Sequence, residues 1–307
     1  MPLRRVMHRR DFLASAAVPL LAQSALAPRA AAQVPRPAGF IVCMHEASSA
    51  GHDFRTAMEG YSRAGIGAVE VDLVKVREYV GQGSPDTARR LLADLGLRPV
   101  SSSNQLFLDE PGPRREQAVE DLKWKVELDE AIGCDRLVIP SAASERHTRD
   151  DYARVIDNLR EAAEIARPHN VTLMVEHTRA STLIGTLRTA LYVVRAVDHP
   201  NLRVMLDTFH FWSGMSKLED LELLRDGELH HLHFEDVPAE PPVEVFEQRH
   251  RVFPGEGIAP LSQIVAILKR KGYSGPASLE LFDPAVQAAN PYDVALKARA
   301  TIEPLIA

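Results

Sequence analysis

The sequence has few cysteines, no glycine-rich phosphate-binding motif and no run of basic residues. Only Cys43 and Cys134 are cysteines among 307 residues, and they fall on the first and fourth predicted strands. Those strands are not neighbours, so we expect two buried free thiols rather than a disulfide. No G-x-G-x-x-G motif follows the first strand, which argues against a dinucleotide-binding fold. The formal net charge of −6, without basic runs, argues against nucleic acid as a partner.

The sequence has no long hydrophobic run. The Ala/Leu-rich run near the N-terminus is short and interrupted. Paired Arg9 and Arg10 precede an Ala/Leu-rich run that Pro19 breaks, so the run is too short for a membrane span. We predict a twin-arginine-type signal peptide over residues 1–32, a linker over 33–38 and export to the periplasm, with no membrane contact afterwards. An uncleaved anchor or a disordered basic tail is the alternative. Removing five Arg and one Asp with the signal changes the formal charge from −6 to −10.

Strand-like and helix-like segments alternate through residues 39–307. Eight segments have the period-two pattern of strands, and amphipathic stretches with apolar residues at helical spacing lie between them. Eight such units over about 270 residues predict an α/β fold, a single-domain (β/α)8 TIM barrel. An irregular stretch at 237–257 should cover one end of it. The predicted strands are residues 39–47, 67–74, 97–105, 134–142, 171–178, 202–210, 229–236 and 276–282.

Four of the predicted strands end in side chains that can bind a metal. Glu176, Asp207, His233 and Glu280 each fall on the face opposite the Val and Leu residues of their strand. The carboxyl ends of barrel strands meet at one face, and carboxylates brought together there need a cation. These residues therefore predict a site for one divalent ion, manganese first, with magnesium, cobalt or zinc as alternatives. Separate pairing of each residue with Arg or Lys at the barrel rim is the alternative.

Further candidates surround these four ligands. His210 should project toward a bound molecule, and Arg251 could enter from the irregular stretch. His45 and Glu46 end the first strand and could bind substrate, with a structural role equally open. His231 is expected one layer deeper as a core or supporting residue. Asp236 could fix the loop or a metal-bound histidine.

Several motifs resemble the xylose-isomerase-like sugar isomerase/epimerase superfamily, and most of all its inosose (2-keto-myo-inositol) isomerase branch. The motifs are CMHEASS, VTLMVEH, NLRVMLDTFHFW, HFED, RVFPGEG and GYSGPASLELF. The resemblance implies that Glu176, Asp207, His233 and Glu280 hold one divalent metal. It also implies that the two glutamates act as acid and base, and that His210 contacts substrate.

The chemistry of such a site predicts an enzyme that acts on keto-sugars. A hydroxy-ketone can chelate the cation, which stabilises the enediolate formed when the intervening C–H loses its proton. Returning the proton isomerises or epimerises a ketose or keto-cyclitol, whereas loss of a β-hydroxyl gives a dehydratase. We predict the isomerase or epimerase. The alternatives are a lyase of the same fold, acting on 3-dehydroshikimate or a keto-sugar, and an exported sugar-binding protein without catalysis. The sequence leaves the oligomeric state open, a homo-oligomer included.

Overall fold

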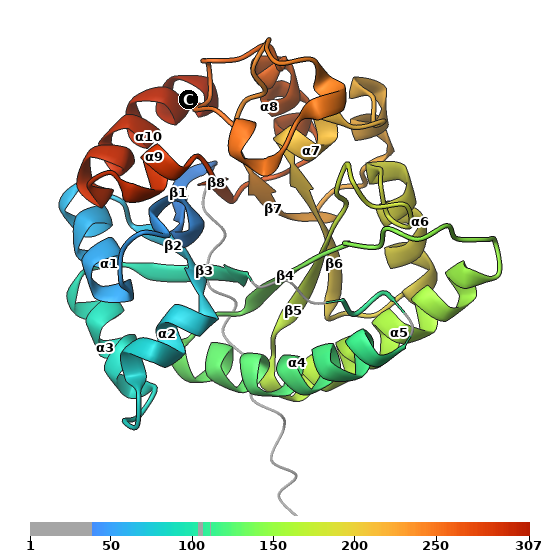
Figure 1. Ribbon diagram of the computed structural model, residues 1–307, viewed down its shortest axis with the longest axis horizontal. Coiled ribbons are helices and arrows are strands. Elements are labelled where there is room, and N and C mark those ends of the chain that lie inside the picture. The colour runs from blue at the N-terminus through green and yellow to red at the C-terminus, as the bar shows by residue number, and fades with distance from the viewer. Residues whose placement is uncertain (1–38, 104–106, 111) are drawn as a thin grey trace, which may run out of the picture. The chain divides into compact units, whose positions relative to one another are not determined.

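Eight parallel strands close into a barrel, and helices surround it (Figure 1). The computed structural model describes residues 39–103, 107–110 and 112–307. The predicted signal peptide over residues 1–32 and the linker over 33–38 lie outside the described residues. The (β/α)8 prediction is confirmed, with each strand inside its predicted segment. The strands are β1 (Ile41–His45), β2 (Ala68–Asp72), β3 (Arg98–Ser103), β4 (Arg136–Pro140), β5 (Thr172–Glu176), β6 (Leu202–Asp207), β7 (Leu229–His233) and β8 (Pro276–Leu279).

Most connections between strands contain a helix that begins at a side-chain cap. Asp53 accepts a hydrogen bond from the Thr56 backbone N–H, and Thr186 does the same for Thr189. The α-helices are α1 (Phe54–Arg63), α2 (Leu73–Val80), α3 (Asp86–Asp94), α4 (Pro113–Ile132), α5 (Asp151–Ala166), α6 (Leu187–Val197), α7 (Thr208–Ser213), α8 (Leu261–Arg270), α9 (Pro284–Ala288) and α10 (Pro291–Ile306). The 3-10 turns are η1 (Glu46–Ser49), η2 (Arg167–His169), η3 (Leu218–Leu223), η4 (Val243–Val245) and η5 (Gln248–His250). Among the described helices, none has both the length and the apolar character needed to cross a membrane.

The alternation along each strand divides the protein into a helix-facing core and a barrel interior. Leu173, Val175 and Leu206 belong to one large cluster with the helices. The intervening Val138, Met174 and Met205 form a separate small cluster inside the barrel. The same alternation directs the polar side chains at the strand ends into the barrel, at the face where the carboxyl ends of the strands meet.

The loop between β7 and α8 is tied to the barrel by one carboxylate. Asp236 accepts hydrogen bonds from the backbone N–H groups of Val237, Gly255 and Ala259. A Cβ on Gly257 would lie 2.2 Å from the carbonyl oxygen of Val237, so only glycine fits there. Asp236 thus fixes the loop, one of the two roles expected for it.

The two cysteines are buried and free. Cys43 lies on β1 as expected. Cys134 does not lie on β4, because the left-handed Gly133 ends α4 and the chain needs two further residues before the strand begins at Arg136.

Candidate metal and active site

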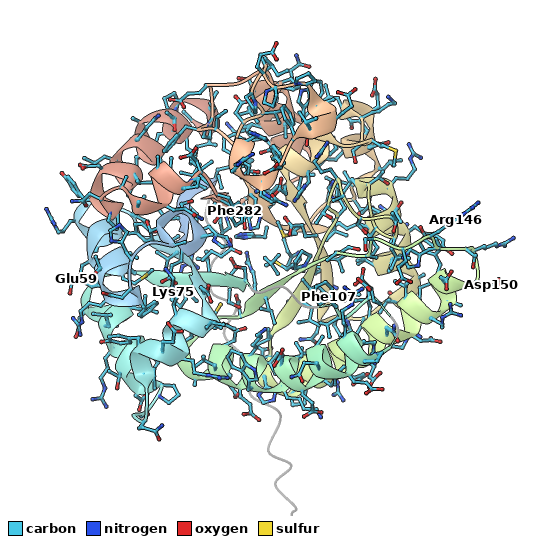
Figure 2. All side chains as sticks on the ribbon, in the orientation of Figure 1. Glu59, Lys75, Phe107, Arg146, Asp150 and Phe282 are labelled. Carbon is cyan, nitrogen blue, oxygen red and sulfur yellow. The ribbon has the colours of Figure 1, made fainter. Side chains whose placement is uncertain are left out.

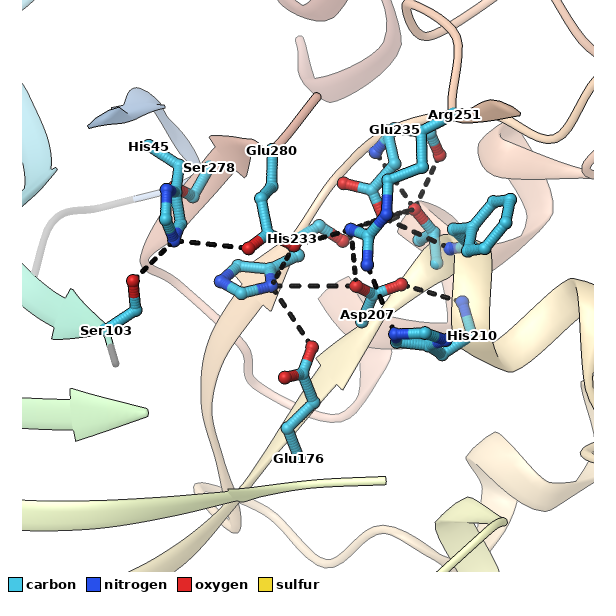
Figure 3. A network of polar contacts seen from close by, with 12 residues as sticks. His45, Ser103, Glu176, Asp207, His210, His233, Glu235, Arg251, Ser278 and Glu280 are labelled. Carbon is cyan, nitrogen blue, oxygen red and sulfur yellow. Dashed lines mark hydrogen bonds and ion pairs between the residues drawn. The ribbon is translucent and has the colours of Figure 1, made fainter. Parts of the chain in front are cut away.

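The four predicted ligands meet at the carboxyl ends of neighbouring strands, with all their ligand atoms within 4.8 Å of one another. Glu176, Asp207 and His233 end β5, β6 and β7, and Glu280 directly follows β8. His233 Nδ1 lies 3.3 Å from an oxygen of Glu176, 3.3 Å from one of Glu280 and 3.6 Å from one of Asp207 (Figure 3). The imidazole therefore stands at the centre of three carboxylates.

Local structure directs Asp207 toward this centre. Its backbone ends β6, and its Oδ1 accepts the His210 backbone N–H at 2.7 Å, which caps the short helix α7. The second oxygen, Oδ2, is left facing His233. One side chain thus both begins a helix and contributes to the site.

The donor atoms of the cluster suit a divalent cation. Oε1 of Glu176 and Nδ1 of His233 are buried and have no hydrogen-bond partner in the described part of the chain, while the buried Oδ2 of Asp207 forms an ion pair with Arg251. Each buried polar atom without a partner costs about 1 to 3 kcal/mol. A cation between them would satisfy both, and a set of three carboxylates and one imidazole fits manganese, magnesium, cobalt or zinc.

Arg251 reaches the cluster from the β7–α8 loop, as predicted. Its Nη1 lies 2.5 Å from an oxygen of Glu280 and 2.7 Å from Oδ2 of Asp207. The guanidinium lies 5.1 Å from the ring centres of both Phe209 and Phe282, and Figure 2 shows Phe282 near the barrel axis. At 3% exposure Arg251 is a buried cation, neutralised by the carboxylates it touches.

The two glutamates have different electrostatic surroundings. Burial raises the pKa of Glu176 to about 8. Burial alone would also raise the pKa of Glu280, but the charges of Arg251, His233 and His45 hold it at about 2. Glu280 is therefore a carboxylate, whereas Glu176 favours its protonated form in the protein without a bound ion.

Two of the predicted substrate-binding residues contact the cluster. His45 Nδ1 accepts the Ala47 N–H at 2.9 Å, so Nε2 carries the proton and lies 3.3 Å from Glu280. His210 Nε2 lies 3.1 Å from Nη2 of Arg251. Burial lowers the pKa of His210 to about 3, so this imidazole is neutral. Their contacts with substrate stay predictions.

Glu46 lies elsewhere. The chain turns into η1 directly after His45, and Oε2 of Glu46 accepts the Asp72 backbone N–H at 2.9 Å. Oε1 lies 3.9 Å from Lys75, and burial raises the pKa of Glu46 to about 8. Glu46 thus bridges η1 to the end of β2 and is not among the residues that the structure brings together at the metal cluster.

Two buried carboxyl groups next to the site, Glu70 and Glu235, are not among the residues predicted from the sequence. Glu70 on β2 contacts both His231 and His233, so His231 is connected to His233 through it. Glu235 accepts the Phe209 backbone N–H at 3.2 Å and lies 3.4 Å from Arg251. Burial and the charge of Asp207 raise the pKa of Glu235 well above its usual range. A signal for Glu70 was present, because it is the one charged residue in the apolar centre of its strand.

A closed (β/α)8 barrel with a carboxylate–imidazole cluster at the carboxyl ends of its strands has the architecture of barrel enzymes with a metal site. Residues 59–303 match the family described as xylose isomerase-like TIM barrel, and the chain belongs to that family. The resemblance found in the sequence is thereby confirmed.

The similar proteins with curated names are enzymes. An inosose isomerase of Halalkalibacterium halodurans is 30% identical over 216 residues, which cover 68% of this chain and 76% of that protein. A 3-dehydroshikimate dehydratase of Pseudomonas aeruginosa is 31% identical over 237 residues, covering 76% of this chain but only 36% of that protein. A crystal structure of the IolI protein with a bound zinc atom superposes with a TM-score of 0.78 at 22% identity, covering 87% of this chain and 97% of that one. This superposition supports the fold.

Proposed function

We propose that the chain is a divalent-metal-dependent isomerase or epimerase of a keto-cyclitol or ketose. The observation that carries the proposal is the pair of buried glutamates, Glu176 and Glu280, which lie on either side of His233 Nδ1 with opposite pKa shifts. A reaction that takes a proton from one carbon and returns a proton to another needs one group that accepts the proton and one group that donates it. The similarity to inosose isomerases supports the same class of substrate.

A cation at this site supplies positive charge that stabilises the enolate-type charge produced when the carbon beside a carbonyl loses its proton. Glu280, kept ionised by Arg251 and His45, accepts that proton. Glu176, on the other side of His233 Nδ1, takes up a proton and returns it to the substrate. His210 and Arg251 border the same space and orient the substrate hydroxyls. In the reverse reaction the two glutamates exchange roles.

The charges at the site favour an uncharged substrate. Carboxyl groups outnumber the single guanidinium of Arg251, which Asp207 and Glu280 already neutralise. With a divalent ion bound, the three ligand carboxylates balance the ion and Arg251, so no unpaired positive charge is left to attract an acidic substrate, and a neutral polyol ketone fits. Manganese is proposed as the ion because three of the four ligands are carboxylates. Export to the periplasm is part of the proposal and rests on the twin-arginine pattern of residues 1–32.

The test is deuterium uptake. The manganese-loaded protein is incubated in heavy water with keto-inositols and ketoses, and mass spectrometry and NMR follow deuterium at carbons beside the carbonyl. An isomerase or epimerase incorporates deuterium and converts one substrate to its isomer. Glu280→Gln should abolish uptake, and Glu244→Gln, an exposed glutamate on the β7–α8 loop, should leave it unchanged. No uptake by the native protein with any compound would contradict the proposal.

A lyase is the second candidate, favoured by the similarity to 3-dehydroshikimate dehydratases. It begins with the same proton transfer and then expels a β-hydroxyl. The same incubation distinguishes the two, because a dehydratase produces a new ultraviolet-absorbing enone or aromatic product and an isomerase does not.

A further inference from the structure

The layer of side chains directly beneath the metal cluster is polar on one half of the barrel and apolar on the other. The apolar half is the cluster of Val138, Met174 and Met205. The polar half comes from β2, β3, β7 and β8 and consists of Glu70, Ser101, His231 and Ser278, each 0% exposed. A buried carboxylate in a barrel interior is costly unless its oxygens are hydrogen-bonded, so this arrangement requires an explanation.

Glu70 is surrounded by hydrogen-bond donors. His231 Nε2 lies 2.6 Å from its Oε2, and Ser278 Oγ donates to the same oxygen at 3.0 Å. His233 Nε2 lies 3.2 Å from both oxygens. Glu70 is thus a carboxylate that accepts from three side chains.

This contact determines which nitrogen of His233 faces the cluster. A neutral imidazole carries one N–H, so donation from Nε2 to Glu70 leaves the lone pair on Nδ1. Nδ1 is the atom that lies between the oxygens of Glu176, Asp207 and Glu280. With a cation among these oxygens, the lone pair on Nδ1 is a ligand.

We propose that Glu70 is a positioning residue that holds His233 in the Nε2–H tautomer and in the orientation that presents Nδ1 to the ion. This inference rests on the proposed metal-dependent function. Carboxylates that accept from metal-bound histidines fix the ring and raise its basicity, and their loss typically lowers metal affinity by about 10- to 100-fold. His231 and Ser278 orient Glu70 in turn, because they bind the oxygen that His233 shares.

The test is cobalt binding to the full-length protein, followed by its visible absorption spectrum and by calorimetry. Glu70→Gln should weaken cobalt binding by about 10- to 100-fold and change the spectrum, because the amide offers an N–H where His233 needs an acceptor. Glu70→Asp keeps the charge but shortens the reach, and its affinity should lie between those of the native protein and Glu70→Gln. Asp129→Asn is the matched control, since Asp129 is an equally buried carboxyl group that binds Ser102 outside the barrel interior.

The outcomes separate this inference from the function proposed above. Unchanged cobalt affinity and spectrum in a folded Glu70→Gln protein overturn the role of Glu70; if that variant does not fold, Glu70→Asp decides in the same way. Absence of cobalt binding by the native protein overturns both proposals. Cobalt binding without turnover of any ketone contradicts the function alone, and the affinities of the Glu70 variants still test the positioning role.

Discussion

Replacing Arg251 by Met tests whether this guanidinium and a bound cation both neutralise the carboxylates of Asp207 and Glu280. The substitution leaves Asp207 and Glu280 buried without the partner that lies 2.7 and 2.5 Å from them. Breaking a buried ion pair by removing one partner costs about 3 to 5 kcal/mol, because the remaining charge has lost its counter-charge. We expect a loss of that size in the metal-free protein. At a urea slope of roughly 3 kcal/mol per M, the midpoint of unfolding falls by at least about 1 M.

Manganese should reverse much of this loss, since the ion supplies the missing positive charge to the same oxygens. The assay is urea unfolding followed by circular dichroism, with EDTA and with saturating manganese. Arg249→Met, on the same loop, is the control. Its pair with Glu247 is more than half exposed on both sides, so no measurable change is expected. A loss below about 1 kcal/mol in EDTA, or an equal loss in EDTA and in manganese, would refute this reasoning.

Three further predictions concern pH and packing. Burial holds the pKa of Glu176 at about 8, and, although burial alone would lower it, the charges of Glu280 and Glu70 raise the pKa of His233 well above its usual range, so protons compete with the ion at both groups. Manganese affinity measured by calorimetry should therefore rise at least about tenfold per pH unit from 6 to 8, and a pH-independent affinity would contradict this. Burial lowers the pKa of His177 to about 4, so the unfolded chain binds more protons and stability falls as the pH drops through the window from 6.5 to 4. His177→Phe should remove about 2 kcal/mol of the loss between pH 7 and 5 in urea unfolding, and an unchanged loss would count against it. Gly257→Ala should lower the melting temperature, because the new Cβ would lie 2.2 Å from the carbonyl oxygen of Val237, whereas Gly67→Ala meets nothing within 4 Å and should not. Equal melting temperatures for the two variants would show that the loop adapts.

The fold could be predicted because one face of each strand packs against helices and the other faces the barrel interior, and the two faces carry different residues. Leu173 and Val175 face the helices while Met174 and Glu176 face inward, and this alternation is visible in the sequence alone. The four candidate ligands could be predicted in the same way, since each is a polar residue at the end of an apolar strand. Their convergence then follows from barrel closure.

The contacts of Glu70 and Glu46 could not be predicted in the same way. Glu70 meets His231 across 161 positions of sequence, from strands β2 and β7 that are not neighbours in the barrel, and the pairing of β2 with β3 shifts register between Val69 and Glu70. Glu46 was expected to end the first strand beside His45, with substrate binding and a structural role equally open. The 3-10 turn that begins at this residue changes the direction of its side chain. Local backbone geometry, which alternation does not report, decided both outcomes.

The central claim is that one divalent ion is bound by Glu176, Asp207, His233 and Glu280. Its most direct test is a crystal structure of the protein grown with manganese, with anomalous scattering measured near the manganese edge. We expect a single strong anomalous peak within about 2.0 to 2.6 Å of His233 Nδ1 and of one oxygen of each carboxylate. Well-ordered side chains with no peak between them, or a peak bound by other residues, would contradict it.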